Sequence, residues 1–79
     1  MCNVKEEKKE SIVNIEKMLI DLELVKDDEK QDDVQKLKNI LSDIKLTLSD
    51  KSTDDLKAIN IVINLPMLYT EVIKLAEAA

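Results

Sequence analysis

The sequence predicts an all-α protein, a small antiparallel up-down-up bundle of three helices formed by a single domain over residues 1–79. Three observations predict this fold. Glycine is absent and Pro66 is the only proline, and a chain with so few turn residues favours long helices over hairpins and barrels. Apolar residues recur at helical spacing in three segments, about 3–26, 29–49 and 54–77. The polar gaps between them are short, which makes successive helices antiparallel neighbours.

The first predicted helix, residues 3–26, carries two apolar patches. Asn3 followed by Glu6 matches a capping box, with Ser11 as an alternative, later start. The main face repeats at 3-4-3 spacing and consists of Ile12, Ile15, Leu19 and Leu22, widened by Met18 and Val25. The second patch, formed by Val13, Ile20 and Leu24, falls within about 40° at 100° per residue. It lies roughly a quarter-turn or more from the main face.

Residues 26–33 contain no apolar side chain and therefore cannot face a core. Asp27 and Asp28 suit a turn and an N-cap, whereas Asp32 and Asp33 favour the first turn of the next helix through its dipole. The alternative is one continuous helix through this segment. Five acidic residues against one lysine between positions 27 and 33 disfavour that alternative, because the acids repel one another.

The second predicted helix, residues 29–49, has the most regular pattern in the chain. Its 3-4-3-4 seam consists of Val34, Leu37, Leu41, Ile44 and Leu48, with Ile40 alongside. Leu46 points away from this seam. In the polar gap that follows, Ser52 or Thr53 is expected to cap the third helix, with Asp54 and Asp55 in its first turn.

The third predicted helix, residues 54–77, is apolar over most of its circumference. One seam consists of Ile59, Val62, Pro66, Tyr69, Ile73 and Ala76, and the other of Ala58, Ile61, Leu65, Leu68, Val72 and Leu75. The last 24 residues hold four charges, while the first 55 hold 25. Such a helix is expected to be surrounded by the rest of the protein. Pro66 removes the hydrogen bond to the Val62 carbonyl, at about 3 kcal/mol in a helix interior, and predicts a kink or a break there.

The composition offers little catalytic chemistry. Histidine and glycine are absent and Cys2 is the only cysteine, which removes the commonest general base, the phosphate-cradling loops and the usual zinc ligands. The acids between Asp27 and Asp33 are interpreted as a solvated helix start, because nothing fixes them around a metal ion. We therefore expect no enzyme activity, no cofactor and no metal site.

The charge of the chain restricts its partners. A net charge of −5 and the absence of arginine argue against nucleic acid and anionic membranes. No stretch approaches the ~18 uncharged apolar residues of a membrane span. A single thiol without a secretory signal fits a reducing compartment, and many Lys, Ile and Asn residues suggest an AT-rich coding sequence of a bacterium, phage or plasmid. We therefore expect a cytoplasmic protein.

Some apolar residues remain after one face of each helix is assigned to the core. The candidate interface residues are Val13, Ile20, Leu24 and Leu46, together with part of the seam Leu65, Leu68, Val72 and Leu75. Three interpretations are open for the Val13 patch. It can rotate into an enlarged core, pair with a second copy across a two-fold axis as in a homodimer, or receive a different protein.

Size, acidity and the lack of catalytic groups together favour a protein-binding role. The leading hypothesis is a small regulatory or inhibitory module of the antitoxin, immunity-protein or phage-inhibitor kind, steered by its acidic surface to a basic patch on its partner. The alternative is a self-associating structural or assembly adaptor with no separate target.

Overall fold

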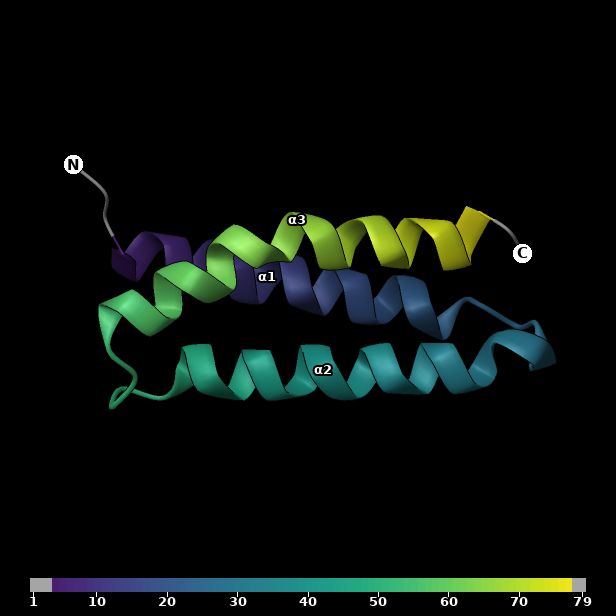
Figure 1. Ribbon diagram of the computed structural model, residues 1–79, viewed down its shortest axis with the longest axis horizontal. Helices are drawn as coiled ribbons and strands as arrows, with labels where there is room; N and C mark the ends of the chain where they lie inside the picture. The colour runs from purple at the N-terminus through teal and green to yellow at the C-terminus, as the bar shows by residue number, and fades with distance from the viewer. Residues whose placement is uncertain (1–3, 78–79) are drawn as a thin grey trace.

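The computed structural model describes residues 4–77 as three long α-helices that pack against one another (Figure 1). In chain order these are α1, Val4–Glu23; the short 3₁₀ helix η1, Asp28–Lys30; α2, Gln31–Ser49; and α3, Asp55–Glu77. The described part of the chain contains no strand, so the predicted all-α class is confirmed. The connection from α1 to α2 lies at one end of the molecule and that from α2 to α3 at the other (Figure 1).

The core lies between the three helices and takes three or four buried apolar side chains from each of them. Its buried apolar members are Ile15, Met18 and Leu22 from α1; Val25 from the first connection; Val34, Leu37, Leu41 and Leu48 from α2; and Ala58, Leu65 and Val72 from α3. Fully burying a side chain of the Leu, Ile or Val class contributes about 1.5–3 kcal/mol. Four of the five predicted α2 seam residues are buried, and the fifth, Ile44, is half-buried.

The chain turns between α1 and α2 because local hydrogen bonds end the first helix and start the second. The Asp27 side chain accepts a hydrogen bond from the Glu29 backbone N–H at 3.0 Å, which confirms its predicted capping role at η1. The Gln31 side-chain amide donates to the backbone carbonyls of Val25 and Asp27 at 3.0 and 3.1 Å. These bonds stabilise a turn in place of one continuous helix.

Ser11 lies inside α1 and does not begin it; the predicted cap Asn3 is outside the described residues.

The start of α3 differs from the predicted one. The backbone N–H of Lys57 donates to the Asp54 carboxylate at 2.8 Å, so Asp54 is the N-cap. The expectation of a cap at Ser52 or Thr53 is wrong, because both hydroxyls are used within the turn. The Ser52 hydroxyl donates to the Asp50 carboxylate and the Thr53 hydroxyl to the Thr47 carbonyl, each at 2.8 Å.

Pro66 lies inside α3, which is one helix from Asp55 to Glu77. The predicted alternative of a break into two helices is therefore wrong. The core residues Leu65 and Val72 follow Ala58 at intervals of seven, so one face stays in phase across the proline. Beyond it, the Thr70 hydroxyl donates to the Pro66 carbonyl at 3.0 Å. Packing of this buried face against α1 and α2 thus keeps α3 helical despite the missing N–H.

The expectation that α3 is surrounded is also wrong. Only Ala58, Leu65 and Val72 are buried along it, whereas Leu56, Ile63 and Met67 are 76%, 66% and 63% exposed. The physical reason is that α1 and α2 both lie on the same side of α3, and two neighbours cover only part of a helix. By length and composition alone, α3 is apolar enough to cross a membrane, and 17% of its most apolar 18-residue window is buried.

Candidate protein-binding surfaces

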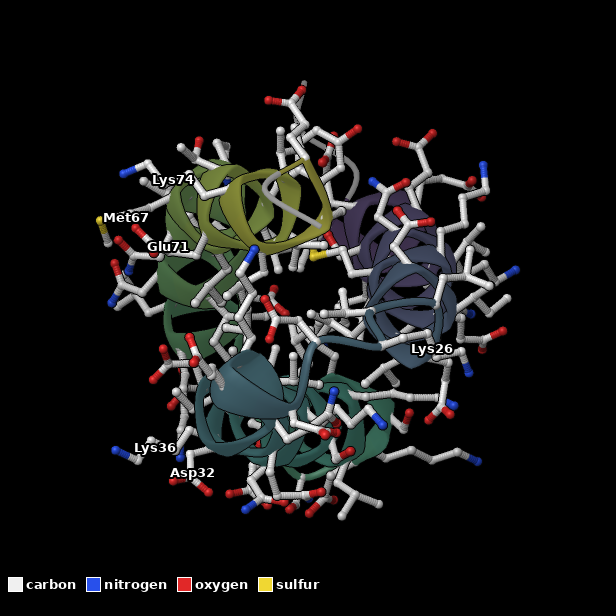
Figure 2. All side chains as sticks on the ribbon, turned by 90° about the vertical axis from the view of Figure 1, so that its right-hand side faces the viewer. Lys26, Asp32, Lys36, Met67, Glu71 and Lys74 are labelled. Carbon is white, nitrogen blue, oxygen red and sulfur yellow. The ribbon has the colours of Figure 1, made fainter. Side chains whose placement is uncertain are left out.

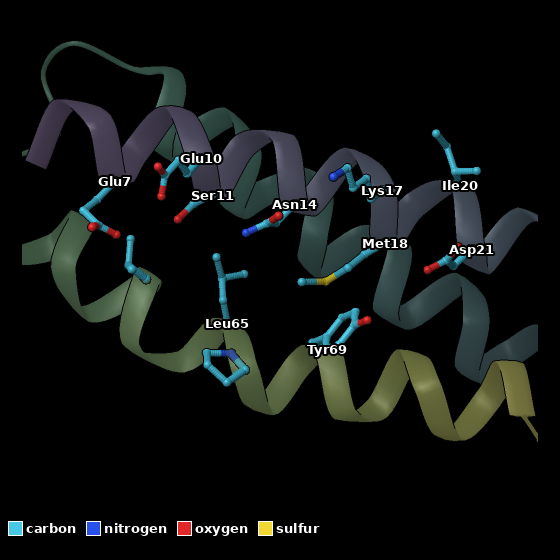
Figure 3. Close-up of a pocket in the computed structure, with 12 residues that line it drawn as sticks. Glu7, Glu10, Ser11, Asn14, Lys17, Met18, Ile20, Asp21, Leu65 and Tyr69 are labelled. Carbon is cyan, nitrogen blue, oxygen red and sulfur yellow. The ribbon is translucent and has the colours of Figure 1, made fainter.

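A groove of about 650 Å³ runs between α1 and α3 (Figure 3). The wall from α3 is apolar and consists of Val62, Leu65, Pro66 and Tyr69. The wall from α1 is mainly polar and consists of Glu7, Glu10, Ser11, Asn14, Lys17, Met18, Ile20 and Asp21. In the close-up, Leu65 and Tyr69 point from α3 toward α1, and Met18 reaches from α1 toward them (Figure 3). The groove therefore has an apolar interior with charged groups along one edge.

The sequence of α1 explains why this groove stays open. Positions 7, 10, 14, 17 and 21 recur at 3-4-3-4 spacing, so they share one face of the helix. Each carries a charged or amide side chain, and removing such a group from water without a partner costs free energy. They therefore keep α1 from closing fully over the apolar wall of α3.

The charge along the groove is negative. Glu7, Glu10 and Asp21 contribute three carboxylates against the single ammonium of Lys17. Within residues 4–77 none of these four side chains forms an ion pair. The groove can thus offer carboxylates to a cationic partner without breaking existing pairs.

Ser11 is the one buried polar residue of the described chain, with an exposed fraction of 3%. Its hydroxyl points from α1 toward the groove, above Leu65 (Figure 3). It makes no hydrogen bond to another described residue. Within residues 4–77, Lys30 Nζ is the one enclosed side-chain polar atom without a partner, so the Ser11 oxygen is not sealed off and is open to a polar group placed in the groove.

Two acidic residues outside the groove, Glu16 and Glu23, are used differently. Lys38 Nζ lies 2.8 Å from Glu23 Oε1, and Lys45 Nζ lies 3.6 Å from Glu16 Oε1, so two ion pairs join α1 to α2. The hydrogen bond from Lys38, reinforced by its charge, holds the pKa of Glu23 below its ordinary value. These carboxylates support the fold and are already occupied.

The Val13, Ile20 and Leu24 patch lies in solvent on α1, with exposed fractions of 49%, 61% and 68%. The interpretation that this patch rotates into an enlarged core is therefore wrong. Ile20 also lies at the edge of the groove, with its side chain directed away from α3 (Figure 3). The patch and the groove are neighbouring surfaces of the same helix.

The remaining candidate interface residues are divided by the structure. Leu46 is exposed on α2, and Leu68 and Leu75 are half-buried. Leu65 and Val72 are both buried in the core. Val72 is therefore not available to a partner and the prediction is wrong for it, whereas Leu65 also lines the groove. The reason is the rotation of α3, which directs the Ala58–Leu65–Val72 line at α1 and α2.

Sequence reasoning missed two features. The polar face of α1 at positions 7 to 21 was not connected with the apolar wall of α3, because only tertiary packing brings them together. The exposed residues Leu56, Ile63 and Met67 were missed because the whole of α3 was assigned to the interior. The sequence did contain an indication of their exposure, because these three residues lie outside both predicted seams.

No group of three or more His, Cys, Asp or Glu side chains that could hold a metal ion occurs within residues 4–77. No family model, curated protein or solved structure matches this chain.

Proposed function

We propose that this chain is a small acidic protein-binding module that regulates or inhibits a partner by holding one of its basic segments against α1. The docking surface consists of the α1–α3 groove and the adjoining Val13, Ile20 and Leu24 patch. The observation that carries the proposal is the combination of an apolar groove with unpaired carboxylates along its edge.

An amphipathic basic helix fits the chemistry of this surface best. Helix-in-groove recognition places apolar side chains at i, i+3, i+4 and i+7 into a hydrophobic channel. Here the channel is lined by Met18, Leu65 and Tyr69. Lysine or arginine residues on the flanks of such a helix would then meet the carboxylates of Glu7, Glu10 or Asp21. The net charge of −5 would speed the encounter with a basic partner and make it sensitive to salt.

The kind of partner follows from the same charge argument. Basic surfaces are typical of proteins that bind nucleic acid, so a nuclease or a nucleic-acid-binding protein is the partner class that we propose. An antitoxin, an immunity protein or a phage-encoded inhibitor would have these properties. The proposal places the protein in the cytoplasm and gives it no catalytic step of its own.

The proposal includes the up-down-up arrangement of the bundle and a bend of α3 at Pro66. The helix connections at opposite ends of the molecule support the arrangement (Figure 1). The groove supports it too, because Ser11 lies beside Leu65 and Met18 beside Tyr69, so α1 and α3 run in the same direction there (Figure 3). A bend is supported by the lost hydrogen bond at Pro66. Spin-label distances between helix ends, in the natural chain and in Pro66→Ala, would test both features.

Affinity capture with matched variants tests the binding surface. Asp21→Lys, in the groove, should lose a basic partner that is retained by Asp43→Lys, on the exposed side of α2. Both substitutions change the charge by the same amount on an exposed helical position. Likewise, Ile20→Ser should weaken capture and Leu46→Ser should not, although both side chains are exposed. Equal capture by all four variants would show that α1 is not the docking surface.

A further inference from the structure

We propose that two copies of this chain pair antiparallel through the outer face of α3, the side turned away from the core. This inference does not depend on the proposed function, and it concerns a different surface. It rests on the exposure, the spacing and the charge of six residues, named here the outer seam: Leu56, Asn60, Ile63, Met67, Thr70 and Lys74.

The outer seam is unpartnered within the chain. All six residues are exposed, and Leu56, Ile63 and Met67 are among the most exposed large apolar side chains of the protein. Viewed along the bundle, Met67 and Lys74 extend outward from α3, away from the other two helices (Figure 2). At 100° per residue, Ala58, Leu65 and Val72 lie on the opposite side of the helix, where they are buried. Pairing through the outer seam therefore leaves the core intact.

The spacing of the outer seam is that of a helix–helix contact, and it is symmetric. Successive members are separated by four, three, four, three and four residues, the alternation found at the seam of a coiled coil. The order of separations reads the same from either end, with its midpoint between Ile63 and Met67. A second copy turned by a two-fold axis through this midpoint therefore matches every position of the seam.

Antiparallel pairing brings chemically compatible groups together in each layer. At the centre of the paired helices, Ile63 of each copy packs against Met67 of the other copy. In the next layer, the Asn60 amide faces the Thr70 hydroxyl of the other copy. That hydroxyl already donates to the Pro66 carbonyl at 3.0 Å, so it is free to accept a hydrogen bond from the amide.

The charges at the two ends of α3 select the antiparallel direction. In the outer layer, the stem of Lys74 lies over Leu56 of the second copy. Its ammonium, which lies 3.7 Å from Glu71 Oε1 of its own helix, is then also within reach of Asp54 and Asp55, the acids that begin the other α3. Parallel pairing would instead place Lys74 beside Lys74 and acids beside acids, and like charges repel.

The apolar composition of α3 has a second conceivable use, insertion into a membrane. The outer seam argues for a second copy instead, because Asn60, Thr70 and Lys74 interrupt its apolar residues at regular places. Crossing a membrane would also pull Ala58, Leu65 and Val72 out of the core. The groove side chains Val62, Pro66 and Tyr69 are not members of the seam, so a dimer would leave both grooves open.

Sedimentation of the full chain tests the proposal. The natural protein should sediment at twice its mass of 9.0 kDa and dissociate on dilution. Ile63→Asp should be monomeric with unchanged helical circular dichroism, while Ile20→Asp, equally exposed on α1, should remain dimeric. Should Ile63→Asp fail to fold, Met67→Lys provides the same test. A natural protein that is monomeric throughout, or a dimer that only Ile20→Asp dissociates, would overturn the proposal.

Two further measurements check the direction of pairing and the membrane. In a Cys2→Ser background, a mixture of Ile63→Cys and Met67→Cys should form more cross-linked dimer than either variant alone. Parallel pairing would favour cross-links within each single variant and would overturn the antiparallel assignment. Flotation with phosphatidylcholine vesicles should leave the protein unbound. Binding to vesicles by the natural chain and not by Ile63→Asp would show that the outer seam contacts lipid, contrary to the proposal.

Discussion

Helices α2 and α3 are of similar length, but they relate to their sequences in opposite ways. In α2, a narrow apolar seam is set among charged residues, and four of its five members are buried. In α3, the helix's own apolar residues are spread around most of its circumference, and only Ala58, Leu65 and Val72 are buried. Polar residues on a helix therefore identify its buried face by exclusion. Where they are scarce, composition indicates burial in general without indicating which side is buried.

The largest expected effect concerns the α2 seam. Leu41 is fully buried, so Leu41→Asp would place an unpaired charge in the core and should unfold the protein. Leu46→Asp, on the exposed side of the same helix, should remain folded. Circular dichroism of both variants checks this contrast. A folded Leu41→Asp would mean that the regular seam of α2 does not hold the core together.

The two sides of α3 should differ almost as strongly. Leu65→Ala removes buried volume and should reduce the free energy of unfolding by about 2–5 kcal/mol. Met67→Ala, on the exposed side, should change it by less than about 0.5 kcal/mol in dilute protein. Urea unfolding of the two variants gives both values. Equal losses would show that α3 is buried on both sides, as the sequence alone suggested.

A smaller effect is expected at the start of α3. Asp54→Ala removes the acceptor for the Lys57 N–H and should cost about 1 kcal/mol. Thermal unfolding at neutral pH is a suitable measurement, with Asp55→Ala as the neighbouring control that leaves the cap in place. A larger loss for the control would contradict the assignment of the cap to Asp54.

The smallest effect is expected from the ion pair that joins α2 to α1. Lys38 lowers the pKa of Glu23 in the folded chain. The pair therefore stabilises the fold above the pKa of the unfolded carboxyl, and this contribution is lost as pH falls through the lower folded value. Lys38→Met should return the Glu23 pKa toward its ordinary range in an NMR titration. Lys36→Met, on the solvent side of α2, should leave it where it is.

Much of the fold could be predicted from periodicity. The three helices, the turn at Asp27 and the α2 seam follow from spacing and capping chemistry that act within a few residues. The cap of α3 was misplaced by one or two residues, because Ser52, Thr53 and Asp54 are all good caps. Only the bonds of the two hydroxyls to Asp50 and Thr47 decide between them.

The candidate site was less predictable than the fold. The exposed patch of Val13, Ile20 and Leu24 was found, since it lies on one helix and is separate from the main face of α1. Assigning Val72 to an interface was wrong, because the rotation of an apolar helix depends on its neighbours. The groove needs α1 beside α3, two helices that the sequence separates by the whole of α2.

Pro66 has a consequence for what the groove can recognise. Since proline has no backbone N–H, the carbonyl of Val62 has no α-helical donor. Both residues line the groove, so a segment bound there would pass close to this part of the main chain. An incoming segment could bond to the carbonyl with any available N–H, whatever side chain that residue carries. The groove would then read the backbone of its occupant as well as its charge, and would tolerate sequence variation at that one position.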